Sequence, residues 1–128
     1  MAIRKRLKLD RIIQGLRRDD PEVLNAVLAT PDGLVIAHTL ASVEAARQLA
    51  ASAAALLALV SRANHKLGHG APREIFVENT GNILYFFCTG SSILAVTLRP
   101  HTELERFLEY GRAAVKEISS ILEHAISH

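Results

Sequence analysis

The sequence LAASAAALLALV, residues 49–60, determines how the rest of the chain is arranged. Its only polar residue is Ser52, and no Gly or Pro interrupts its run of strong helix formers. An apolar seam with alternating spacings of four and three runs through it and beyond: Leu49, Ala53, Leu56, Val60, Ala63 and Leu67. This spacing is typical of a helix that packs along another helix.

A second apolar stripe lies beside that seam: Ala50, Ala54, Leu57 and Ala58. An ordinary amphipathic helix has one apolar stripe and one polar face, so this helix is expected to bury two sides. One side can cover the protein's own sheet, and the other then needs a partner. The alternative, a helix enclosed in a larger core, is less compatible with a chain of 128 residues.

The apolar run is bounded by Gln48 and Arg62 and is shorter than the roughly 20 residues of a membrane span. We therefore expect no transmembrane segment and a soluble, cytoplasmic protein. The single cysteine, Cys88, excludes an intramolecular disulfide and fits a reducing compartment.

The net charge of +2 conceals an asymmetry along the chain. Residues 1–18 hold seven basic residues and one acidic residue, whereas the remainder holds eight basic and twelve acidic residues. We therefore interpret residues 1–8 as a basic N-terminal arm and residues 9–128 as a single domain. Such an arm could contact nucleic acid, an anionic membrane or an acidic protein, or simply be a solvated helix start. It carries no aromatic residue for base stacking, so no nucleic-acid partner is expected.

Outward from the Ala-rich helix, hydrophobic periodicity and turn residues predict eight elements. A short helix is indicated by Leu9, Ile12, Ile13 and Leu16, and a hairpin by two strands around Pro31-Asp32-Gly33. The long helix is expected from a Ser42 cap to Leu67, with Gly68 ending it. The predicted strands are residues 23–30, 34–39, 73–78, 83–89 and 92–98, and a final helix follows a Thr102–Glu105 capping box.

The predicted order is therefore helix, two strands, helix, three strands, helix. We expect an α+β fold in which a five-stranded antiparallel sheet lies between helical layers. Residues 73–78 alternate, with Ile75 and Val77 on one face and Glu74, Phe76 and Glu78 on the other. At the edge of a sheet, such a strand would leave backbone groups unpaired unless something covered them.

The chain resembles the Roadblock/LC7 domain family over nearly its whole length. The resemblance rests on Ala29–Ala37 at the first hairpin, on the Ala-rich helix, and on the strand Ile93–Val96. It implies a profilin- or longin-like Roadblock fold and a homodimer in which the long helices pack together and the third strands pair edge to edge. It also implies a non-catalytic partner of a small Ras-like GTPase, or a light-chain adaptor in a larger assembly. The arm at residues 1–8 is outside the shared pattern.

The sequence contains few motifs of catalytic or ligand-binding chemistry. The sequence lacks a phosphate-binding loop, a dinucleotide fingerprint and a nucleophile elbow, so we expect no enzyme and no cofactor. His65 and His69 stand four apart, but Gly68 interrupts the helix between them and no third ligand is near, so no metal is expected. Cys88 has no basic neighbour in sequence and is expected to be an inert core thiol.

Three functions remain open from the sequence: a regulator of a small Ras-like GTPase, a scaffold or adaptor subunit of the dynein-light-chain type, and a small-molecule sensor. The dimer interface is expected at these residues: Leu49, Ala53, Leu56, Val60, Ala63, Ile75, Phe76 and Val77. Arg47 and Arg62 are fifteen positions apart, about 60° around the helix axis. They are therefore the expected docking residues for the GTPase, or else solvated charges beside a hydrophobic helix.

Overall fold

The structure is a computed structural model that describes residues 2–126. Its eight elements follow the predicted order, and their bounds are α1 Ile3–Asp19, β1 Val23–Ala29, β2 Val35–His38, α2 Val43–Lys66, β3 Glu74–Glu78, β4 Ile83–Cys88, β5 Ile93–Leu98 and α3 Leu104–Ile126. The predicted hairpin turn is confirmed, because Gly33 adopts the positive φ of 95° that the turn requires.

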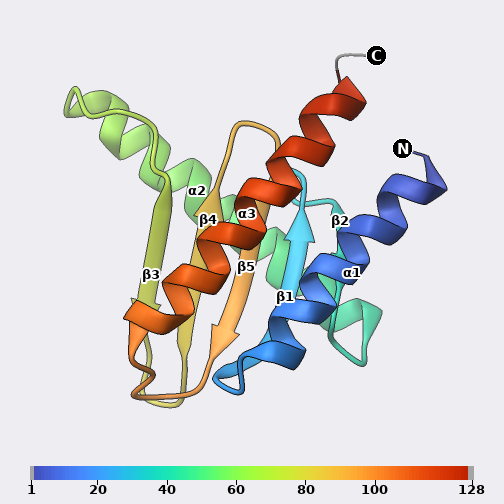
Figure 1. Cartoon of the computed structure of the whole chain (residues 1–128). Coiled ribbons are helices and arrows are strands. Elements are labelled where there is room, and N and C mark those ends of the chain that lie inside the picture. Colours follow the sequence, from blue (N-terminus) through green and yellow to red (C-terminus); the bar gives the residue numbers. More distant parts are fainter. Residues whose placement is uncertain (1, 127–128) are drawn as a thin grey trace.

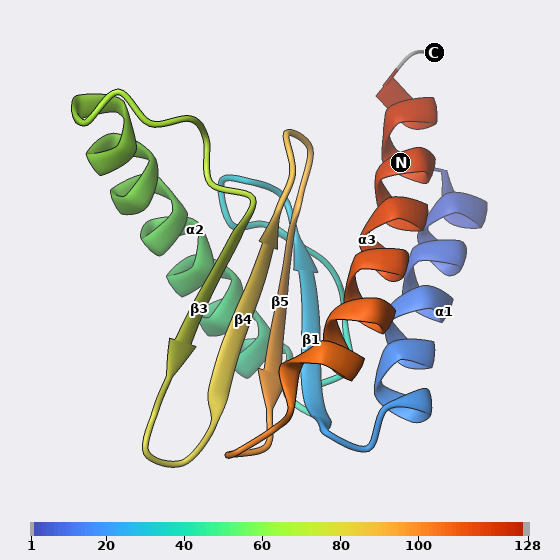
Figure 2. The ribbon, with the colours of Figure 1, turned by 60° about the vertical axis from the view of Figure 1, so that its left-hand side comes forward.

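The five strands form one antiparallel sheet in the order β2-β1-β5-β4-β3. Helix α2 covers one face of this sheet, and α1 and α3 lie side by side on the other (Figures 1 and 2). The predicted α+β architecture, with the sheet between helical layers, is therefore confirmed. It places β2 at one edge of the sheet and β3 at the other.

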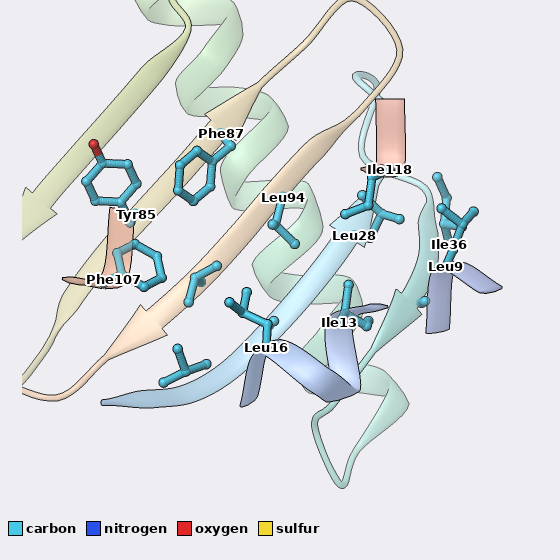
Figure 3. Close-up of a cluster of buried hydrophobic side chains, with 14 of the residues drawn as sticks. Leu9, Ile13, Leu16, Leu28, Ile36, Tyr85, Phe87, Leu94, Phe107 and Ile118 are labelled. Carbon is cyan, nitrogen blue, oxygen red and sulfur yellow. The ribbon is translucent and has the colours of Figure 1, made fainter. Parts of the chain in front are cut away.

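The larger hydrophobic core fills the space between the sheet and the helix pair α1 and α3 (Figure 3). Leu9, Ile13 and Leu16 of α1 are buried there, at the periodicity that predicted the helix. The aromatic rings of Tyr85 and Phe87 pack against Phe107 of α3, with ring centroids 5.5 and 5.8 Å from the Phe107 centroid. This core anchors both terminal helices to the sheet.

Helix α1 begins earlier than its apolar periodicity predicted. It starts at Ile3, six residues before Leu9, so the basic residues assigned to an arm lie, from Ile3 onward, in its first two turns. The periodicity could not indicate this, because the apolar residues of these turns, Ile3 and Leu7, are exposed and face away from the core.

The predicted capping box at the start of α3 is wrong. Helix α3 begins at Leu104, and the Thr102 hydroxyl lies 2.7 Å from the Arg99 carbonyl and 3.1 Å from Glu22 Oε2. Thr102 therefore ties the β5–α3 turn to the start of β1, a contact between residues 80 positions apart that no local motif indicates.

Candidate protein interface

Both ends of α2 are fixed by signals that the sequence contains. Ser42 Oγ accepts a hydrogen bond from the Ala45 amide at 3.2 Å, which confirms the predicted N-cap. Gly68 adopts a φ of 74° just beyond the helix, and Asn64 Nδ2 donates to the Gly70 carbonyl at 3.1 Å. These contacts set where the helix stops and where the chain turns back toward β3.

The N-terminal half of α2 packs on its own sheet. Ala46, Ala50 and Ala53 are at most 2% exposed, and Leu49 and Leu56 are partly buried against the same strands. Three predicted interface residues, Leu49, Ala53 and Leu56, therefore contact their own chain, and Ala53 has almost no surface left for a second one. The sequence could not reveal this, because apolar residues occupy nearly every position of the segment.

The C-terminal half of α2 has a different environment, because it extends past the sheet on the side of β3 (Figures 1 and 2). Leu59 and Leu67 are 60% and 68% exposed. Of the predicted interface residues here, Ala63 is exposed and Val60 is partly buried. This half of the helix therefore presents apolar side chains to solvent.

Strand β3 offers a second unpaired surface next to this one. It pairs with β4 alone, and its other edge has no neighbouring strand in the sheet. The Cys88 amide donates to the Arg73 carbonyl at 2.7 Å, which makes this pair a hydrogen-bonded pair of the antiparallel ladder. Since such pairs alternate along a ladder, the amide and carbonyl groups of Glu74, Phe76 and Glu78 point away from β4 and toward the free edge.

The side chains of β3 alternate as the sequence predicted. Ile75 and Val77 pack with residues of α2 and β4 on one face. Phe76 is 52% exposed on the other face, where its ring stacks on Tyr85 with centroids 6.0 Å apart. All three predicted residues therefore lie at the free edge of the sheet.

A polar cluster fixes β3 to the helix layer behind it. Arg112 of α3 binds Glu74 through two hydrogen bonds of 2.9 and 3.0 Å, and the Tyr85 hydroxyl donates to the same carboxylate. The hydrogen bond from Arg112 is the main reason that the pKa of Glu74 is lowered. Burial, followed by the Glu74 carboxylate, raises the pKa of Tyr85 to about 12. Sequence reasoning missed this cluster, because Arg112 lies 38 positions from Glu74 and no local motif links the two residues.

The two predicted docking residues, Arg47 and Arg62, are both exposed on α2. Among the residues that the structure describes, neither forms an ion pair with another side chain. Their guanidinium groups are therefore available to a partner, although nothing in the single chain distinguishes them from ordinary solvated cations.

Among the side chains that the structure describes, no three His, Cys, Asp or Glu residues cluster as metal ligands would. Cys88 is half-buried, and this burial, followed by the Glu74 carboxylate, raises the pKa of its thiol to about 11, which disfavours the thiolate. An open depression of about 760 Å³ lies between the end of α2 and the 70–73 loop, beside Cys88.

Helix α2 is long and apolar enough, by length and composition, to cross a membrane, with a mean hydropathy of 1.4 over its most apolar 18 residues. The shortness of the apolar run is therefore not sufficient to exclude a span. The packing of Ala46, Ala50 and Ala53 on the sheet is the stronger argument, because a helix cannot keep this contact and be surrounded by lipid. Only 17% of that window is fully buried in the single chain, and its other residues are partly or largely exposed.

The sequence of the chain was compared with known protein families and with curated proteins. The model of the family described as Roadblock/LC7 domain matches residues 9–98. No curated protein matches the chain in sequence.

Solved structures with the same fold cover almost the entire chain. A Roadblock/LC7 domain from Streptomyces avermitilis is 26% identical, covers 89% of this chain and 97% of its own, and has a TM-score of 0.84. MglB of Myxococcus xanthus is 20% identical over 97% of this chain and 94% of its own, with a TM-score of 0.86. A profilin from Schizosaccharomyces pombe, 12% identical over 88% of this chain and 98% of its own, shares the fold with a TM-score of 0.63.

Proposed function

Since the chain belongs to the Roadblock/LC7 domain family, we propose that it is a non-catalytic, homodimeric regulator of a small Ras-like GTPase in the cytoplasm. The proposal needs an interaction surface and no reactive group, which agrees with the chemistry described above. The proposed function assigns the interaction surfaces to α2 and to the edge strand β3.

The main support for the proposal is that an exposed apolar surface and an unpaired strand edge lie next to each other. The C-terminal half of α2 exposes Leu59 and Leu67, and the neighbouring edge of β3 directs unpaired backbone groups outward. Soluble monomers rarely leave a contiguous apolar patch uncovered, and exposed sheet edges are usually blocked. One partner that binds both surfaces would bury the apolar side chains and pair the free backbone groups.

A second copy of the chain is the partner that fits both. Two β3 edges can pair in antiparallel orientation about a two-fold axis and extend the sheet across the dimer. The same axis brings the two α2 helices together, so that the exposed members of the predicted seam, Ala63 and Leu67, and the partly buried Val60 meet their counterparts. Each surface then contacts the same surface of the second chain, as a two-fold interface requires.

The GTPase would bind on the solvent side of the paired helices, where Arg47 and Arg62 provide cations for an acidic or phosphate-bearing surface. We favour docking over donation of an arginine finger, because a symmetric dimer can reposition the catalytic residues of the GTPase itself. The contribution of the dimer is then a difference in affinity for two states of its partner.

The experiment is a binding measurement with a purified small Ras-like GTPase of the same organism, loaded either with GDP or with a non-hydrolysable GTP analogue. A regulator binds the two states unequally, since only differential affinity can shift the conformation of the partner. Equal affinity for both states would favour the scaffold or adaptor role instead. Absence of binding in both states would reject the GTPase partner.

A further inference from the structure

The first two turns of α1 combine exposed apolar side chains with a high density of positive charge. Ile3 and Leu7 are 79% and 58% exposed, and they stand one helical turn apart on the same face. Basic residues lie around them on the same turns and the next: Arg4, Lys5, Arg6, Lys8 and Arg11. Neither the core nor the surface proposed for the dimer uses this part of the helix.

The charges lie on both sides of the apolar pair. With about 100° per residue, Arg4, Lys8 and Arg11 project on one side of Ile3 and Leu7, and Arg6 projects on the other. Leu9, Ile13 and Leu16 occupy the opposite side of the helix and hold it on the sheet. The helix thus has two apolar stripes. One is buried against the sheet, and the other is exposed between basic side chains.

The local sequence at the N-terminus of α1 lacks the residues that usually stabilise the start of a helix. No acidic residue lies in the first turn, and the N-cap, Ala2, makes no side-chain hydrogen bond to the free amides. Arg4, Lys5 and Arg6 place positive charge at the end of the helix where the backbone dipole is already positive. An anionic partner placed there would offset this repulsion.

We propose that this segment, residues 3–11, docks on an anionic lipid surface. Ile3 and Leu7 would enter the boundary between head groups and acyl chains, and the surrounding Arg and Lys side chains would contact lipid phosphates. A duplex nucleic acid would satisfy the cations but offers no apolar environment to Ile3 and Leu7, and residues 1–18 contain no aromatic side chain for stacking on single strands.

Few acidic groups oppose this contact. Asp10 is the only acidic residue among residues 1–18, and Glu117 of α3 lines the same surface groove as Arg11. The segment lies on the face of the sheet opposite α2 (Figure 2). A membrane-bound molecule therefore keeps α2 and the edge of β3 free, and this proposal is independent of the GTPase.

The test is co-sedimentation of the full chain with vesicles of phosphatidylcholine that contain either no anionic lipid or about 30% phosphatidylglycerol. We expect binding to the anionic vesicles alone. The combined variant Arg4→Gln, Lys8→Gln, Arg11→Gln should bind about a hundredfold more weakly, at about fivefold per cation. The combined variant Ile3→Ser, Leu7→Ser should bind roughly tenfold more weakly, because it loses apolar insertion and keeps all charges.

The matched control is the variant Arg47→Gln, Arg62→Gln, Lys66→Gln, which removes the same number of charges from α2 and should bind within about twofold of the wild type. All the replaced residues are exposed, and unchanged melting temperatures would show that each variant is folded. The proposal is overturned if the wild type does not bind anionic vesicles, or if the control weakens binding as much as the α1 variant. It is also overturned if Ile3→Ser, Leu7→Ser has no effect, since the segment would then attract any polyanion, including duplex DNA.

Discussion

Two glycines lie inside helices, and their surroundings predict opposite effects of the same substitution. A methyl group on Gly111 of α3 would lie 2.5 Å from Cζ of Phe87, a ring that is itself buried. The nearest neighbour of such a methyl group on Gly15 of α1 is the end of the flexible Arg18 side chain at 3.4 Å.

We therefore expect Gly111→Ala to lower the free energy of unfolding by about 1–2 kcal/mol, because the strain of overpacking exceeds the gain in helix propensity. Gly15→Ala should raise it by about 0.5–1 kcal/mol, since only the propensity changes. Urea unfolding of both variants beside the wild type measures the difference. Equal shifts of the same sign would show that α3 does not pack on Phe87 as described.

The raised pKa of Tyr85 should make the free energy of unfolding depend on pH in the alkaline range. Its pKa is raised from 10.0 to about 12 in the folded protein, so its contribution to stability is complete below pH 10 and is lost as the pH rises toward 12. Tyr85→Phe should remove that part of the alkaline loss. It should also cost about 1.5 kcal/mol at neutral pH, through loss of the hydrogen bond to the Glu74 carboxylate.

The measurement is urea unfolding of wild type and Tyr85→Phe across that pH range. The difference in stability between the two proteins should shrink above pH 10. A constant difference between wild type and Tyr85→Phe at all pH values would contradict the cluster.

At the scale of the element, the sequence was informative where a pattern is local. The order of helices and strands, the Ser42 cap, the Gly68 stop and the alternation along β3 all follow from short-range signals, and the structure confirms them. The orientation of α2 did not follow, because a helix with apolar residues on almost every side has no single face that the sequence can assign to the core. The start of α1 and the role of Thr102 depend on exposed or long-range features that hydrophobic periodicity does not report.

Strand β3 permits a test that separates folding from association. The Phe76 amide points away from β4, so Phe76→Pro removes a donor at the free edge and leaves the β3–β4 ladder intact. We expect this variant to fold but to weaken dimerisation by about tenfold or more, while Phe76→Ala, which retains the amide, isolates the loss of the ring.

Sedimentation velocity over a concentration series measures the dimer dissociation constant of both variants. Ala71→Pro, in the loop before β3, is the control for the introduction of a proline and should dimerise like the wild type. If Phe76→Pro and Ala71→Pro dimerise equally well, the edge of β3 is not an interface.

At the scale of the whole molecule, the proposed regulation depends on the outer side of α2. Arg47→Ala and Arg62→Ala should each weaken binding of the GTPase by about tenfold and leave the rate of GTP hydrolysis in the saturated complex unchanged, since docking and not an arginine finger is proposed. Binding titrations and single-turnover hydrolysis on the same samples separate these effects. A loss of about a thousandfold in saturated turnover with intact binding would instead show that one of these residues acts as a finger.

The dimer is the assumption on which the proposed function rests, and the distribution of apolar surface makes it testable with single substitutions. Ala63 lies on the part of the seam that the sheet leaves uncovered, whereas Ala51, also exposed, lies about 120° away around the same helix. Because both are exposed alanines of α2, Ala63→Asp and Ala51→Asp impose a similar cost on the folded monomer and differ in what they do to a second chain.

The most direct measurement is the mass of the purified protein in solution by multi-angle light scattering at micromolar concentration. The chain has a mass of 14.0 kDa, and we expect twice this mass for the wild type and for Ala51→Asp, with 14.0 kDa or aggregation for Ala63→Asp. A monodisperse wild type of 14.0 kDa would contradict it, because the apolar half of α2 and the edge of β3 would then be stable without a partner.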